Sequence, residues 1–263
     1  MKYMDLVRSK QPLVICLTND VVKNFTANGL IAVGASPAMS AHADDLKDLL
    51  RYAGALLINI GTADERSEAL YHAAMTIANE YGVPAVLDPV ACGASAFRKR
   101  IALELLEQHT FAVLRGNASE VAALIGERVQ SKGVDSQAAE DVAAIAQAAA
   151  KTYGLTVAVT GETDAVSNGK EVCLLHNGSA MMPKVVGTGC LLGAVVAAYV
   201  GVAADDTYEA CAEALGMYAV AGELAAEAPL GHRPGHYAVH FIDALYTVTD
   251  EAVRQRLYKE VQA

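Results

Sequence analysis

The sequence lacks any cluster of lysine or arginine, and its formal net charge is −10. Nucleic acids and anionic membranes bind through basic patches, so we expect neither as a partner. The chain does not open on a basic segment followed by an apolar run, and it has no apolar run long enough to span a bilayer. These absences predict a soluble, cytoplasmic protein.

Cysteine is sparse and scattered. The five cysteines are odd in number and never form a CxxC pair: Cys16, Cys92, Cys173, Cys190 and Cys211. This spacing argues against a disulfide framework and against a zinc site, and it favours a reducing compartment such as the cytoplasm.

Two common phosphate-binding motifs are also missing. At the turn Gly187-Thr188-Gly189-Cys190 the next glycine is Gly193, one residue too late for GxGxxG. No Lys-Ser or Lys-Thr follows, as a P-loop requires. A dehydrogenase of the Rossmann type is therefore disfavoured, and any phosphate at this turn is bound in another way.

What the sequence does have is an alternating pattern typical of an α/β protein. It is 263 residues long and 53% hydrophobic, with no linker or repeat, which predicts one domain over 1–263. Apolar runs and helical patterns alternate up to residue 159, so we expect a mostly parallel central sheet with helices on both faces. The expected strands are 13–17, 55–60, 84–87, 111–114 and 156–159, followed by a hairpin of 165–167 and 171–175 around Asn168-Gly169. The expected helices are 21–33, 44–52, 64–81, 101–109, 119–125 and 136–153, then a helix after Cys190 and a helical C-terminal third.

Polar residues follow several of these strands. The residues at these strand ends are Asn59, Gly61, Thr62, Asp88, Arg115, Asn117, Glu120, Thr160 and Glu162. Ligands of such sheets bind outside the carboxyl ends of the strands, so we expect these residues to border a site.

The turn Gly187–Cys190 runs directly into an uncharged apolar segment. The free amide groups and the positive dipole end of a helix that starts there would bind an anion. A glycine-rich corner that opens a buried helix explains the same residues, and both interpretations remain open. Cys190 is then an inert thiol, a covalent nucleophile, or a small side chain that lines the anion site with its thiol acidified by the helix.

Asp88 and Glu120 lie after neighbouring strands and suit a magnesium ion, which takes one or two carboxylates plus substrate phosphates. The alternative is structural, since Asn117-x-x-Glu120 is also a capping box. Arg115 could pair with either carboxylate or hold a phosphate. His232, His236 and His240 are spaced by four, but Pro234 interrupts them, so we expect a loop entering a helix rather than a metal face.

Six segments in order resemble hydroxyethylthiazole kinases, enzymes of thiamine salvage. They are TNDVVKNFTANGLIAVGASPAMS, LLINIGT, VLDPVACGAS, LRGNASEVAAL, VAVTGETD and VVGTGCLLGAVVAAY, from about Leu13 to Tyr199. The resemblance implies a ribokinase-like three-layer fold. It also implies phosphorylation of the primary alcohol of 4-methyl-5-(2-hydroxyethyl)thiazole with ATP and Mg²⁺, and a homotrimer with active sites between subunits.

The resemblance also implies roles for individual residues. Met39 and Gly187 look like substrate contacts, with Asn24 and Gly61 as further candidates for the thiazole pocket. Arg115, Thr160 and Gly189 look like ATP-binding residues, Asp88 and Glu120 would hold magnesium, and Cys190 stands where the wider superfamily has a general-base Asp. Val186 departs from the threonine expected there. Two alternatives remain: a kinase for another heteroaromatic alcohol, such as a hydroxymethylpyrimidine, and a non-catalytic ATP-binding protein.

Overall fold

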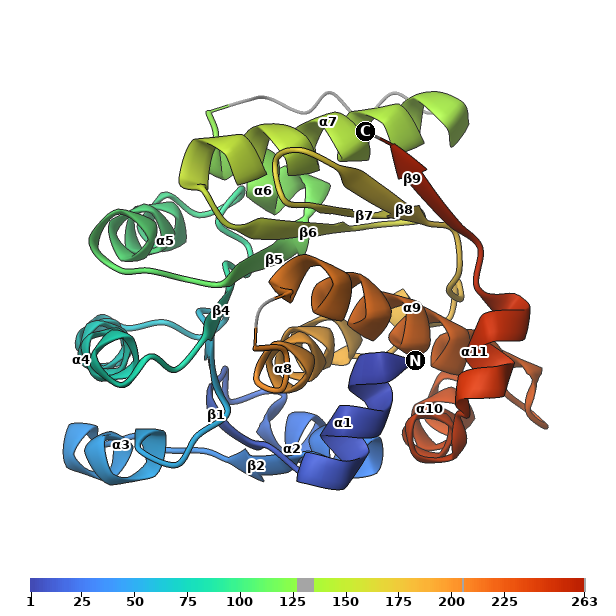
Figure 1. The fold of residues 1–263 in the computed structure, drawn as a ribbon, viewed down its shortest axis with the longest axis horizontal. Helices are drawn as coiled ribbons and strands as arrows, with labels where there is room; N and C mark the ends of the chain where they lie inside the picture. Colours follow the sequence, from blue (N-terminus) through green and yellow to red (C-terminus); the bar gives the residue numbers. More distant parts are fainter. Residues whose placement is uncertain (127–134, 205, 263) are drawn as a thin grey trace.

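A nine-stranded sheet crosses the whole molecule (Figure 1). The computed structural model describes residues 1–126, 135–204 and 206–262. The strand order is β2-β1-β3-β4-β5-β6-β7-β8-β9. The strands are β1 (Leu13–Leu17), β2 (Ser36–Ala38), β3 (Ala55–Asn59), β4 (Ala85–Asp88), β5 (Val113–Asn117), β6 (Thr156–Thr160), β7 (Asp164–Ser167), β8 (Val172–Leu175) and β9 (Lys259–Gln262).

The sheet is parallel from β2 to β6 and antiparallel from β6 to β9. This confirms the predicted parallel sheet and the hairpin at Asn168-Gly169, which joins β7 to β8. Both outermost strands, β2 and β9, were not predicted. The β2 strand has only three residues and contains Pro37. The β9 strand is mostly exposed and begins with Lys259 and Glu260, so neither strand presents the apolar run that identifies a buried strand.

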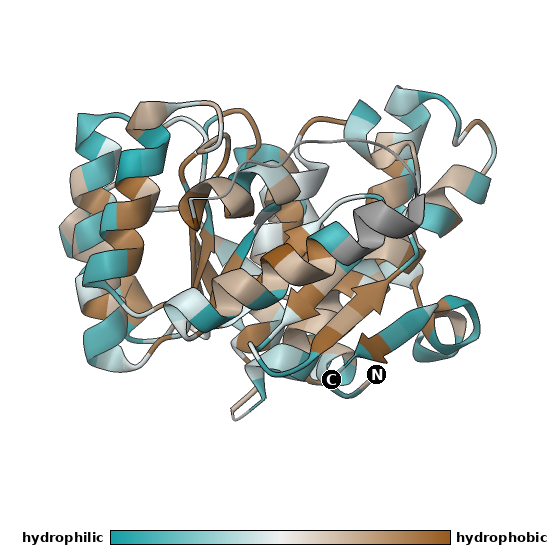
Figure 2. Ribbon diagram, turned by 90° about the horizontal axis from the view of Figure 1, so that it is seen from above, coloured by the Kyte–Doolittle hydropathy of each residue, from teal (hydrophilic) through white to brown (hydrophobic). Residues whose placement is uncertain are grey.

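Helices cover both faces of the sheet, which confirms the three-layer prediction (Figure 1). One layer contains α3 (Ala43–Leu50), α4 (Glu65–Tyr81), α5 (Ala96–Gln108), α6 (Ala118–Leu124) and α7 (Asp135–Tyr153). The other contains α1 (Lys2–Lys10), α2 (Lys23–Val33), α8 (Thr188–Val200), α9 (Thr207–Glu227), α10 (Pro234–Thr247) and α11 (Asp250–Arg256), with the 3₁₀ turn η1 (Met182–Lys184) before α8. Each layer has its own cluster of buried apolar side chains against the sheet. Hydrophobic residues are concentrated on the strands and the inward faces of the helices (Figure 2).

Two helices differ from the prediction. The N-terminal helix α1 was not expected, and α5 begins at Ala96, five residues earlier than predicted, because Ser95 caps it by accepting a hydrogen bond from the Arg98 amide. Pro234 is the first residue of α10, which confirms a loop entering a helix at the three histidines. Among the described helices, none combines the length and the apolar character that a membrane crossing requires.

The helix α8 is the most buried helix of the second layer, and its position is set by two glycines. A Cβ atom on Gly29 of α2 would lie 2.3 Å from Leu191 of α8, so α2 and α8 can approach closely only without a side chain there. A Cβ atom on Gly193 would lie 3.2 Å from Leu57 and 3.3 Å from a carboxylate oxygen of Asp88. The second turn of α8 is therefore held against the middle of β3 and the carboxyl end of β4.

Candidate active site

The predicted polar residues meet where the parallel strands end. Asn59 at the end of β3 is in register with Asp88 at the end of β4, and Asn117 at the end of β5 is in register with Thr160 of β6. Register alone therefore brings side chains from four strands to one edge of the sheet, as the sequence predicted.

A buried ion pair forms the centre of this edge. Arg115 Nη1 lies 3.5 Å from Asp88 Oδ2, and Arg115 Nη2 donates a hydrogen bond of 2.7 Å to Thr160 Oγ1. Both charged side chains are buried, yet Asp88 Oδ1 and Arg115 Nε have no hydrogen-bond partner among the described residues. Burial raises the pKa of Asp88 to about 7, although the Arg115 guanidinium opposes the shift. Buried polar atoms without hydrogen-bond partners lower the free energy of unfolding, so stability alone does not explain this pair.

The turn before α8 lies against the same arginine. Gly187, with φ of 99°, is the N-cap residue, and no side chain caps the helix. A Cβ atom on Gly187 would also lie 3.1 Å from Phe25. A Cβ atom on Gly189 would lie 3.4 Å from both terminal nitrogens of Arg115. The amino-terminal end of α8 and the guanidinium therefore face one space, and both attract anions.

That space is part of a cavity of about 870 Å³. Arg115, Thr160 and Gly189 line it, together with the segments 161–162, 176–180 and 182–184. Its lining combines charged groups with apolar side chains such as Met182 and Pro183, as ligand pockets commonly do. The three residues predicted to bind ATP thus share one cavity large enough for a nucleotide.

Cys190 lies in the first turn of α8 and is the least buried of the five cysteines, all of which are unpaired thiols. Asn19 Nδ2 donates a hydrogen bond of 3.4 Å to its sulfur. Burial raises the pKa of the Cys190 thiol, and the Asp88 carboxylate adds to this effect. The direction of the shift is opposite to the acidification that the sequence suggested, and its largest cause is burial.

Asn59, which the sequence predicted at this edge, is joined there by Asn19, which sequence reasoning did not assign to the site. Asn19 Nδ2 also donates to Asn59 Oδ1 at 2.9 Å, and Asn59 Nδ2 donates to Asp88 Oδ2 at 2.8 Å. The signal was present, since each asparagine follows a buried apolar strand closely. What the sequence could not give was the pairing of the two amides.

Glu120 has the capping role that the sequence offered as an alternative. Asn117 accepts from the Glu120 amide, and Glu120 Oε2 accepts from the Asn117 amide at 2.8 Å. Glu120 Oε1 accepts from the amide of Ala91 at 2.7 Å, which holds the left-handed backbone of Ala91 in the β4–α5 loop. Both oxygens of this buried carboxylate therefore already accept a hydrogen bond.

The remaining predicted contacts are more dispersed. Gly61 packs on Asn19, because a Cβ atom there would lie 2.8 Å from Asn19 Nδ2. Met39 follows the edge strand β2 and packs partly buried against the core. Asn24 lies on the exposed side of α2, where it accepts a hydrogen bond from Asn28. The structure brings Gly61 beside the polar centre, and it does not bring Asn24 there.

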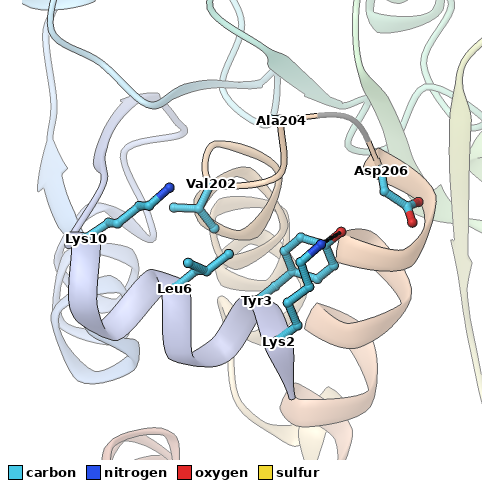
Figure 3. Close-up of a pocket in the computed structure, with 7 residues that line it drawn as sticks. All are labelled: Lys2, Tyr3, Leu6, Lys10, Val202, Ala204 and Asp206. Carbon is cyan, nitrogen blue, oxygen red and sulfur yellow. Dashed lines mark hydrogen bonds between the residues drawn. The ribbon is translucent and has the colours of Figure 1, made fainter.

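A second, smaller hollow of about 250 Å³ lies between α1 and the segment that joins α8 to α9 (Figure 3). Its lining includes Tyr3, Leu6 and Val202, with Lys2 and Asp206 at one side. Asp206 already caps α9 by accepting from the Glu209 amide. Within the described ranges, this hollow shares no lining residue with the larger cavity, and none of the predicted site residues lines it.

Sequence comparisons identify close relatives of the chain. The family model described as "HK: Hydroxyethylthiazole kinase family" matches residues 4–251. Hydroxyethylthiazole kinase 1 of Streptococcus pneumoniae serotype 4 is 54% identical over 255 residues, which cover 97% of this chain and 98% of the relative.

Solved structures give the same grouping. The structure of a hydroxyethylthiazole kinase protein from Pyrococcus horikoshii OT3 superposes with a TM-score of 0.91 at 37% identity, covering 100% of this chain and 98% of that one. A ribokinase-like superfamily protein from Enterococcus faecalis superposes with a TM-score of 0.68 at 13% identity, covering 90% of this chain and 88% of the other. At that identity the second likeness shows the fold alone.

Proposed function

Because this chain belongs to the hydroxyethylthiazole kinase family, we propose that it transfers the terminal phosphoryl group of ATP to the primary alcohol of 4-methyl-5-(2-hydroxyethyl)thiazole. The observation that carries this proposal in the structure is the position of Arg115 against the uncapped end of α8. Phosphoryl transfer depends mainly on holding the reactants in line and on stabilising charge on the phosphoryl oxygens. The arginine and the helix end supply that stabilisation at one point.

The ATP phosphates would bind to the amides that begin α8, with Gly189 leaving room for the arginine. Arg115 would contact the phosphates, and Thr160, which already accepts a hydrogen bond from Arg115, would fix the direction of the guanidinium. The rest of the cavity would hold the nucleoside. These assignments are supported by the shared lining of the cavity and by the orphaned Arg115 Nε.

We also propose that Mg²⁺ binds with Asp88 and Glu120. Asp88 fits a cation, since its Oδ1 is buried and has no hydrogen-bond partner among the described residues. Glu120 fits less directly, because both its oxygens accept backbone hydrogen bonds, so it would act on the ion through a bound water. When bound, the ion would neutralise charge on the phosphates. Asp88 itself would orient the cation and help to keep Arg115 in place.

The substrate alcohol would lie beside Cys190 and Gly187, with Met39 and Gly61 as contacts for the thiazole ring and Asn24 as a further candidate. Cys190 would line the space for the transferring group. Burial raises the pKa of Cys190, so the group stays a neutral thiol, and a neutral thiol is a weak proton acceptor. In a loose transition state the alcohol keeps its proton until late, and a weak acceptor then suffices.

A homotrimer with active sites between subunits completes the proposal, along with one domain spanning the chain and a cytoplasmic location. Val186 directly precedes the glycine turn, and Val21 precedes Val22, which lies beside Gly187; the two valines are 72% and 70% exposed. Exposed apolar side chains near the site suit contact with a neighbouring subunit. Sedimentation equilibrium should give three times the chain mass, and a monomer at assay concentration would remove the shared site.

The function is tested by measuring ADP release with ATP and the thiazole alcohol, with and without Mg²⁺. We expect turnover only when all three are present. A hydroxymethylpyrimidine serves as the competing substrate. Faster turnover of the pyrimidine would replace the proposed substrate, and no turnover of either alcohol by folded, ATP-binding protein would contradict the kinase function.

A further inference from the structure

Three hydrogen bonds connect Cys190 to Asp88 through two side-chain amides, and a fourth, from the backbone of Gly61, fixes one of these amides. The Asn19 amide donates to Cys190 Sγ at 3.4 Å and to Asn59 Oδ1 at 2.9 Å. The Asn59 amide donates to Asp88 Oδ2 at 2.8 Å. The backbone amide of Gly61 donates to Asn59 Oδ1 at 3.1 Å. The chain of contacts thus runs from the proposed alcohol side of the site to its proposed cation side.

The contact from Gly61 fixes the orientation of the side-chain amides of both Asn59 and Asn19. A backbone N–H can only donate, so the Asn59 atom facing Gly61 must be its oxygen. The Asn59 nitrogen then faces Asp88, and Asn19 must turn its own nitrogen toward the Asn59 oxygen. The same nitrogen of Asn19 therefore donates to Cys190, and the sulfur accepts.

We propose that Asn59 is a positioning residue of the phosphoryl transfer, which orients Asn19 toward the sulfur of Cys190 and holds one oxygen of Asp88. The proposal rests on the kinase function proposed above. Asn59 is completely buried, so it acts only through its neighbours. Because Asn19 donates a hydrogen bond to the Cys190 sulfur, the thiol proton points away from Asn19. The sulfur is then oriented to accept a proton from the substrate alcohol. Because Asp88 Oδ2 is held, its free Oδ1 keeps a fixed direction.

A packing role alone would also explain a buried asparagine. The first test therefore measures the alkylation rate of the Cys190 thiol in the absence of substrate. Iodoacetamide is the probe, and the modified peptide is quantified by mass spectrometry. The other four cysteines are buried, so Cys190 reacts first. Asn59→Leu should slow alkylation of Cys190 by about tenfold, the value of one hydrogen bond to the reacting atom. An unchanged or faster rate would overturn the proposal.

The matched control is Asn79→Leu. Asn79 also makes two hydrogen bonds through its amide, both to the backbone of Thr110 at the opposite ends of the strands. Its loss should leave alkylation of Cys190 unchanged. If Asn59→Leu does not fold, Asn59→Ser serves in its place, since the smaller hydroxyl can still accept from Gly61 but cannot span Asn19 and Asp88. It should slow alkylation in the same direction, and an unchanged rate again counts against the role.

The second test separates positioning from packing by kinetics. Asn59→Leu should lower kcat by about 10²-fold, as small misplacements of reacting groups do, while KM for ATP and for the alcohol stays within about twofold. In a Cys190→Ala background, Asn59→Leu should lower kcat by a smaller factor, because part of its effect in the wild type depends on the Cys190 sulfur. An equal loss in both backgrounds, or a loss confined to KM, would contradict it.

The two tests fail in different ways. If the wild-type chain does not phosphorylate the thiazole alcohol, the proposed function is wrong, and the alkylation rates still decide whether Asn59 orients the groups around Cys190. If the chain is active and alkylation is insensitive to Asn59, the function stands and the positioning role is wrong.

Discussion

Arg100 and Arg115 each lie near two carboxylates, and they are bonded in opposite ways. Arg100, on the surface of α5, makes contacts of 2.6 and 2.9 Å to Glu68 and 2.9 Å to Glu104. Arg115 is buried near Asp88 and Glu120, and within the described part of the chain its contact to a carboxylate is 3.5 Å, to Asp88 Oδ2. The surface arginine makes three short hydrogen bonds to carboxylates, whereas the buried arginine keeps one nitrogen without a hydrogen-bond partner among the described residues.

This difference distinguishes a structural cluster from a site. Glu68, His72 and Glu104 offer ligand atoms within 4.8 Å of one another, which by spacing alone could suggest a metal centre. Both oxygens of Glu68 and one oxygen of Glu104 already accept hydrogen bonds from Arg100. At Asp88 an oxygen is buried without a partner, and that deficit is what a substrate or cation would relieve. A buried polar atom without a hydrogen-bond partner is thus a better indicator of a binding site than a cluster of charged side chains.

The largest expected effect comes from breaking the buried arginine. Arg115→Met should lower kcat/KM by about 10³-fold, since a preorganised donor to the transferring group is lost. Arg100→Met, a matched substitution at the surface cluster, should change kcat/KM by less than about twofold. Coupled ADP-release assays on folded variants measure both. Equal effects of the two substitutions would erase the distinction drawn between the clusters.

Cys190 should contribute less than Arg115. Cys190→Ala and Cys190→Ser should keep measurable activity, with a loss of no more than about 10²-fold, near the lower limit for general-base catalysis. Cys190→Asp should remain active, because a carboxylate is the better proton acceptor. Single-turnover assays with the thiazole alcohol give the rates. Background activity in both Cys190→Ala and Cys190→Asp, or a covalently modified Cys190 trapped during turnover, would give the thiol an essential chemical role.

The carboxylates of the two clusters should differ in their response to Mg²⁺. Glu120→Gln should raise the Mg²⁺ concentration for half-maximal turnover by about tenfold, as loss of an outer-shell partner does. Asp88→Asn should raise it further. Glu104→Gln, in the surface cluster, is the control and should leave the requirement unchanged. If neither Asp88→Asn nor Glu120→Gln changes the Mg²⁺ dependence, the metal assignment is wrong and Glu120 is a capping residue only.

The smallest effect concerns stability and pH. Burial raises the pKa of Asp164 to about 6, although the Gly161 amide opposes it. The folded state therefore binds the proton more tightly, and stability falls as pH rises from about 3.8 to about 6. Asp164→Asn keeps the acceptor for Gly161 and removes this loss, so it should be more stable by about 1 to 2 kcal/mol at pH 8 and about equal at pH 3.5.

Glu68 provides the opposite case for the same experiment. Its hydrogen bonds from Arg100 lower the pKa of the carboxyl below the ordinary 4.5, so its contribution is present above that pH and lost as the pH falls. Glu68→Gln should therefore destabilise at pH 8 and matter less in acid. Urea unfolding across pH gives both curves, and two curves of the same sign would contradict the contrast.

The sequence predicted the strands of the central sheet well because each is a short apolar run buried on both faces, as at Leu13–Leu17. It missed β2 and β9, whose residues are too few or too exposed to leave that pattern. It predicted that Asp88, Arg115 and Thr160 would share an edge, because parallel strands end together.

The finer parts of the site required coordinates. The amide pairing of Asn19 with Asn59 depends on side-chain directions across two strands, which spacing does not specify. The direction of the Cys190 pKa shift depends on burial, and the sequence suggested only the helix end. Asn24 is exposed on α2, so its proposed place in the thiazole pocket would depend on a neighbouring subunit, which the sequence pattern does not place.

For protein engineering, α8 is a poor place to diversify. Leu191 fills the space left by Gly29, and Gly193 lies directly on Leu57 and Asp88, so random libraries along this helix should yield mostly misfolded clones. Val186, immediately before the turn, is 72% exposed and meets no such restriction. Mutagenesis aimed at bulkier alcohol substrates should therefore begin at Val186 and the loops around the cavity, and should leave the sequence of α8 unchanged.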